Sequence, residues 1–115
     1  MWVFLNNAFL SVVSKGPDPD KLCVRTRVKG DIERVFPGFD VIAKAGTDYS
    51  YRAFIPRDVV ANRLAGLATG LDYSNFKNSV HEPVRHDAYM RVWEVMYDYQ
   101  MEAKRPERGG NHDRK

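Results

Sequence analysis

The chain has 115 residues, enough for one domain, and a hydrophobic content of 43% predicts an ordinary core. The formal charge of +3 is mild and lies partly in residues 104–115, so it favours nucleic acid only weakly. A single cysteine, Cys23, excludes an internal disulfide and fits a reducing compartment. No stretch is apolar and long enough for a bilayer, so we expect a soluble, cytoplasmic protein with no membrane partner.

Hydrophobic periodicity and turn residues divide the chain into strands and helices. Two-residue alternation predicts five strands, over residues 2–5, 9–13, 22–28, 40–44 and 49–55. Asn6-Asn7 supplies the turn between the first two, because Asn tolerates positive φ. Helical spacing and capping residues predict three helices, over residues 32–36 after Asp31, 58–71 and 86–102, with a brief helical turn between the last two and a break at Pro83.

This order, β-β-β-α-β-β-α-α, predicts the α+β class, with an antiparallel sheet of about five strands and helices on one face. Without its first strand it is ββαββα, a circular permutation of the ferredoxin-like βαββαβ. We expect a right-handed crossover from strand three to strand four, with strand five beside strand three. One domain is predicted over residues 1–103. Residues 104–115 are predicted to be a disordered charged tail, because they have no apolar side chain to bury.

The third and fifth strands carry the best candidate site. Alternation sends one set of side chains to the core, namely Leu22, Val24, Val28, Tyr49, Tyr51, Ala53 and Ile55. The opposite set includes a candidate partner-binding group, namely Arg25, Arg27, Arg52 and Phe54. Arginine can bind phosphate in a bidentate way, and a ring can stack on a base or fill a protein pocket. The alternative is a solvated outer surface with no partner.

The last predicted helix carries an apolar stripe of Tyr89, Val92, Trp93 and Met96. Such spacing is typical of a side packed against a core. A groove for a partner is the alternative interpretation. Of Tyr97 and Tyr99, at least one is expected at the surface, because both cannot face the core with Trp93.

The sequence predicts no catalytic residue, no metal and no cofactor. His81 and His86 are five residues apart with Pro83 between them, whereas a zinc-protease helix needs two His four apart. The chain has no nucleophile elbow and no glycine-rich phosphate loop. No nucleophile, base and orienting group are placed together, so an enzyme ranks third among the functions considered.

Four segments, residues 1–4, 9–13, 48–52 and 71–77, together resemble a family of short, functionally uncharacterised proteins encoded by bacteria and their mobile elements. The resemblance extends to about Tyr99. It implies a compact bacterial or phage domain, and it assigns no activity and no catalytic residue.

These observations favour a non-catalytic binding protein that regulates or inhibits a larger macromolecular partner through the arginine and aromatic side chains of the sheet. The partner is expected to be a protein or nucleoprotein. Direct nucleic-acid binding by the same side chains is the alternative. The sequence leaves the oligomeric state open.

Overall fold

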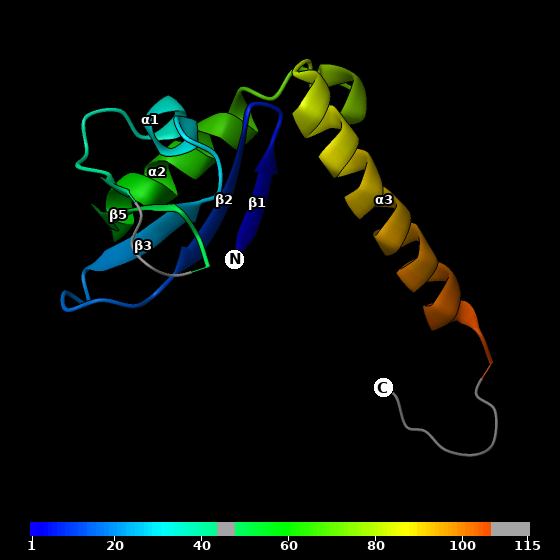
Figure 1. Ribbon diagram of the computed structural model, residues 1–115, viewed down its shortest axis with the longest axis horizontal. Helices are drawn as coiled ribbons and strands as arrows, with labels where there is room; N and C mark the ends of the chain where they lie inside the picture. The colour runs from blue at the N-terminus through cyan, green and yellow to red at the C-terminus, as the bar shows by residue number, and fades with distance from the viewer. Residues whose placement is uncertain (44–47, 107–115) are drawn as a thin grey trace. The chain divides into compact units, whose positions relative to one another are not determined.

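A computed structural model describes residues 1–43 and 48–106 (Figure 1). The contacts divide the chain into two compact units, Met1–His81 and Glu82–Lys115. The first unit combines an antiparallel sheet with helices, which confirms the predicted α+β class. The single domain over residues 1–103 stays a prediction, and the predicted tail lies outside the described residues from residue 107 onward.

Within the described residues the sheet has the strand order β1-β2-β3-β5-β4, and all neighbours are antiparallel. The strands are β1 (Trp2–Leu5), β2 (Ala8–Val13), β3 (Lys21–Thr26), β4 (Ile42–Ala43) and β5 (Tyr51–Pro56). As predicted, β5 lies beside β3. The order β2-β3-β5-β4 is therefore the one expected for the permuted ferredoxin-like arrangement. Asn6-Asn7 forms the hairpin turn and pairs Leu5 with Ala8, which sets the register of β1 and β2.

Helices α1 (Asp31–Val35) and α2 (Arg57–Thr69) cover one face of this sheet (Figure 1). α1 contacts β2, β3 and β5, whereas α2 contacts β3 and β5. The core between them is built from fully buried apolar side chains, among them Leu10, Val24, Ile32, Ile55 and Val60. Each such side chain contributes about 1.5–3 kcal/mol on burial, so this face stabilises the unit.

Val28 and Asp31, which follow β3 in the chain, are placed differently from the sequence prediction. The strand ends at Thr26, so the alternation stops there and Val28 is 50% exposed instead of facing the core. Asp31 does not cap α1, because Gly30 occupies the N-cap position with a φ of 94°. The Asp31 carboxylate is instead fully buried. It accepts hydrogen bonds from the Phe9 N–H at 3.1 Å and from Arg34 at 2.7 Å, and so ties α1 to β2.

The second unit contains the long helix α3 (Pro83–Lys104), preceded in the chain by the short 3₁₀ helix η1 (Lys77–Ser79). α3 begins at Pro83, which the sequence pattern treated as a break. Proline is favoured at the first helical position because that residue's N–H has no partner inside the helix. The Glu82 side chain caps the helix by accepting from the N–H groups of Val84 and Arg85, at 3.1 and 2.9 Å.

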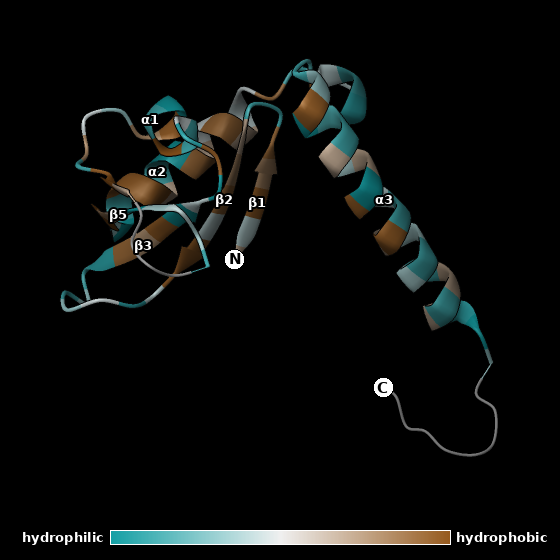
Figure 2. Ribbon diagram, viewed as in Figure 1, coloured by the Kyte–Doolittle hydropathy of each residue, from teal (hydrophilic) through white to brown (hydrophobic). Residues whose placement is uncertain are grey.

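The prediction that α3 buries its apolar stripe is wrong. No residue of α3 is buried, and Trp93 and Met96 are each 53% exposed. Figure 2 shows hydrophobic segments repeated along the helix. Among the described residues, no helix has the combination of length and apolar character that crossing a membrane requires.

Candidate binding site on the arginine face

The side of the sheet opposite α1 and α2 is called the arginine face here. Strand pairing places one row of side chains straight across it, in the order Trp2, Ser11, Arg25, Arg52 and Ile42. Alternation along the strands directs these side chains away from the core, as the sequence predicted for the two arginines. The row therefore joins all five strands on one surface.

Arg25 and Arg52 lie directly opposite each other on β3 and β5. Like charges in this position repel each other, because directly opposed Cβ atoms are only about 4.5–5.5 Å apart. Arg25 donates from Nη2 to the Ser11 hydroxyl at 2.7 Å, while its buried Nε has no hydrogen-bond partner among the described residues. Both side chains are half-buried, so water screens their charges incompletely. The two guanidinium-bearing side chains therefore lie where one anionic group can approach both.

Arg27 lies beyond the end of β3 and is held by the segment that precedes β5. It forms a bidentate ion pair with Asp48, with Nη1–Oδ1 and Nη2–Oδ2 distances of 3.0 and 3.2 Å. The Tyr49 ring lies against two guanidinium groups, with its centroid 4.1 Å from Cζ of Arg27 and 4.4 Å from Cζ of Arg25. Tyr49 precedes β5 and is buried, as predicted, but it packs against the arginines and is not part of the core cluster between the sheet and the helices.

The ion pair also sets the protonation of its two members. The hydrogen bond from Arg27, and then its charge, hold the pKa of Asp48 below its usual 3.8. The same hydrogen bond raises the pKa of Arg27 further above its already high value. Both groups therefore stay charged at neutral pH. The guanidinium of Arg27 is already bound to a carboxylate of the same chain, that of Asp48.

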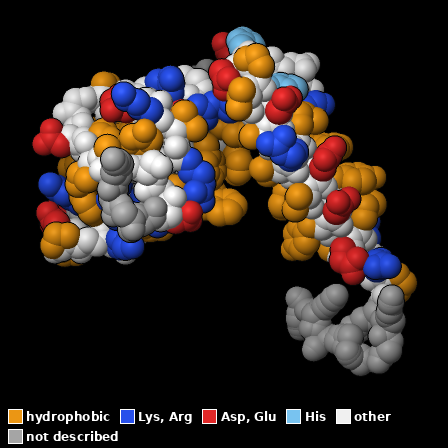
Figure 3. All heavy atoms as spheres, in the orientation of Figure 1, with side chains coloured by type: hydrophobic (Ala, Val, Ile, Leu, Met, Phe, Trp, Pro, Cys, Tyr) orange, Lys and Arg blue, Asp and Glu red, His pale blue; other side chains and the backbone are white. Residues whose placement is uncertain are grey.

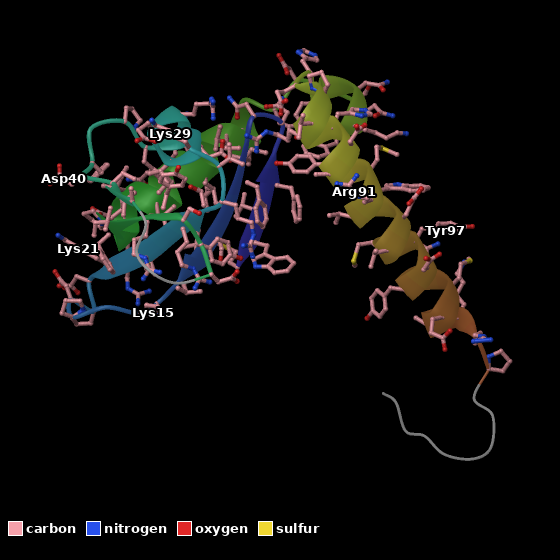
Figure 4. All side chains as sticks on the ribbon, viewed as in Figure 1. Lys15, Lys21, Lys29, Asp40, Arg91 and Tyr97 are labelled. Atoms are coloured by element: carbon pink, nitrogen blue, oxygen red, sulfur yellow. The ribbon has the colours of Figure 1, made fainter. Side chains whose placement is uncertain are left out.

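Phe54 lies on the same face but one side of its ring is already covered. Gly16, in the loop between β2 and β3, comes so close that a Cβ there would lie 2.7 Å from Cε1 of Phe54. The φ of +117° at Gly16 also favours glycine. Next to Phe54 is a hollow of about 300 Å³, whose lining includes Lys21 of β3 and Ile42 of β4. Figure 4 labels Lys21, which is the first residue of β3.

The sequence analysis missed three rings on the arginine face, namely Trp2, Phe4 and Phe9. Trp2 and Phe9 meet edge to face with centroids 5.9 Å apart, and Phe4 and Phe9 lie 4.6 Å apart. Trp2 is 66% exposed. The alternation of residues 2–5, combined with the two-residue turn at Asn6-Asn7, contained this information, because together they fix which side chains share a face.

A second hollow, of about 500 Å³, lies on the helix-covered side of the first unit. Its apolar lining includes Val3, Leu64 and Leu67, and Arg34 and Arg63 also line it. Arg63 donates from Nε to the Val35 carbonyl at 2.8 Å, which fixes its side chain at this hollow. The hollow is large enough for an apolar side chain of another molecule.

Within residues 1–43 and 48–106, no group of three or more His, Cys, Asp or Glu side chains is arranged to hold a metal ion. Comparisons with protein families, curated proteins and solved structures return no match for this chain. The resemblance to short bacterial and phage proteins therefore stays a prediction.

Proposed function

We propose that the protein is a non-catalytic binding protein that regulates or inhibits a larger protein partner through its arginine face. The observation that carries this proposal is the directly opposed, half-buried pair of Arg25 and Arg52. A carboxylate from a partner would relieve the repulsion between them and form charge-assisted hydrogen bonds. The exposed Trp2 lies on the same face, and arginine and tryptophan are both enriched at the energetic centres of protein interfaces.

Nucleic-acid binding is the second candidate, and the three rings on the same face favour it. Trp2, Phe4 and Phe9 lie on the same face as the arginines, so a nucleic-acid strand could stack its bases on the rings while its phosphates meet the arginines. The mild net charge of +3 supports this candidate less well, because phosphate contacts dominate such affinities.

The test is co-purification from host extract with the tagged full chain, followed by mass spectrometry and nucleic-acid staining of the eluate. The test variant combines Arg25→Gln with Arg52→Gln, which removes both charges and keeps similar side-chain length. Lys29→Glu is the control, because this exposed lysine lies outside the face and its change lowers the net charge by the same amount.

The protein-partner proposal expects one captured protein that the control retains and the double variant loses. A nucleic acid captured in its place, with affinity that falls steeply as salt rises, would support the second candidate. If the double variant captures the same molecules as the wild type, the arginine face is a solvated surface and both proposals fail.

A further inference from the structure

α3 has an apolar surface that is wider than a helix needs to pack on one surface. In the part of α3 from residue 87 to residue 102, the charged side chains recur every three or four residues. They therefore fall in one narrow stripe along the helix, made of Asp87, Arg91, Glu94, Asp98 and Glu102. Figure 3 shows this charged stripe along α3 with hydrophobic side chains at both edges. A helix that packs on one surface needs an apolar arc of only about 100°. The remaining arc of α3 is far wider than that.

The side of α3 opposite this stripe is called the α3 seam here. It has Tyr89, Trp93, Met96 and Gln100 at its centre and Met90, Val92, Tyr97 and Tyr99 along its edges. None of these side chains is charged. The middle of the seam therefore has no like charge that would repel an identical surface. Two positive charges lie on the same side toward the helix ends, namely Arg85, which donates to the Tyr89 hydroxyl at 3.5 Å, and Lys104.

We propose that two copies of the chain pair through the α3 seam. A surface whose middle carries no charge is compatible with itself, and a two-fold axis places the same residues on both sides of the contact. Trp93 and Tyr97 are already stacked, with centroids 5.6 Å apart and planes 11° apart. The stacked pair presents one continuous aromatic surface to a second copy. Figure 4 shows the labelled Tyr97 projecting outward from α3.

The exposed area is consistent with a weak dimer. Trp93, Tyr97 and Tyr99 are 53%, 47% and 64% exposed. With rings of about 200 Å² each, they offer roughly 300 Å² per copy, or about 600 Å² for the pair. Val92 and Met96 add further area, which brings the total close to the ~1,000 Å² that a specific interface needs. We therefore expect an equilibrium between monomer and dimer in the micromolar range.

The pairing involves only the unit Glu82–Lys115 and does not rest on the function proposed for the arginine face. It is tested by sedimentation of the full chain across the micromolar range. The test variant combines Trp93→Ser with Tyr97→Ser, and the matched control combines Glu94→Gln with Asp98→Asn in the same turns of the charged stripe. Wild type and control should associate alike, whereas the test variant should associate at least tenfold more weakly. A wild type that stays monomeric, or a test variant that associates unchanged, overturns the proposal.

Single cysteines give a second measurement that leaves the Trp93 and Tyr97 rings in place. Met96→Cys lies at the centre of the seam, whereas Asp98→Cys lies on the opposite stripe. Cys23 is buried in the first unit and is common to both variants. Under mild oxidation, Met96→Cys should form a disulfide-linked dimer and Asp98→Cys should remain largely monomeric. Equal cross-linking of the two variants would contradict the proposed seam.

Discussion

Tyr49 provides the sharpest test of how the arginine face is held together. We expect Tyr49→Phe to retain most of the stability, because a phenyl ring can occupy the same place between Arg25 and Arg27. Tyr49→Leu keeps an apolar side chain but removes the ring. The difference between the two variants therefore contains the attraction between the guanidinium groups and the aromatic ring, together with the loss of buried area from the smaller side chain.

Its magnitude follows from the exposure of the two arginines. A guanidinium over a ring contributes about 0.5–1 kcal/mol at an exposed site and about 2 kcal/mol when desolvated. Arg27 is exposed and Arg25 is half-buried, so Tyr49→Leu should be roughly 1.5–3 kcal/mol less stable than Tyr49→Phe. Urea unfolding at neutral pH measures the free energy of both variants. Equal stabilities would refute the stacking argument and leave only the burial of the side chain to explain the position of Tyr49.

Two further predictions concern ion pairs that differ in burial. Arg34→Ala should lower the free energy of unfolding by about 3–5 kcal/mol, because it leaves the buried Asp31 carboxylate without its guanidinium, whereas Asp31→Ala should cost only about 1–3 kcal/mol. The reverse order in denaturant unfolding would count against this account. For the exposed pair, Arg27→Ala should raise the pKa of Asp48 toward 3.8 in a carboxyl NMR titration. Arg27 lowers the pKa of Asp48 in the folded state, so the ion pair stabilises the fold above pH 3.8, and this stabilisation is lost as the pH falls through the lowered pKa of Asp48. A pKa of Asp48 that is unchanged in Arg27→Ala would contradict the ion pair.

The arrangement of the sheet could be predicted because local rules determine most of it. Two-residue alternation located the strands, and the turn at Asn6-Asn7 fixed the register of the hairpin. The expected crossover from strand three to strand four left a position for the fifth strand beside strand three, and β5 does pair with β3. Arg25, Arg52 and Phe54 lie on the predicted face for the same reason, because a strand alternates its side chains whatever the rest of the chain does.

The contacts made by the loops could not be predicted in this way. Asp48 and Tyr49 precede β5, so alternation does not determine their direction. Their positions depend on the Arg27 and Arg25 side chains, which are more than 20 residues away in the sequence. Asp31 shows the same limit, since its sequence position favours a helix cap, while its contacts with Phe9 and Arg34 require the folded sheet.

α3 shows why a correct helix prediction can still give the wrong surroundings for its side chains. A stripe of apolar residues at helical spacing is required both by a helix that packs into its own domain and by one that pairs with another molecule. The width of the apolar arc distinguishes them better than its period, because packing on one surface needs only part of the circumference. Between Asp87 and Glu102 the charged residues of α3 occupy a single stripe, so most of the circumference of this stretch is apolar. That excess, with Trp93 and Tyr99 more than half exposed, is the reason to look for a second copy beside this helix.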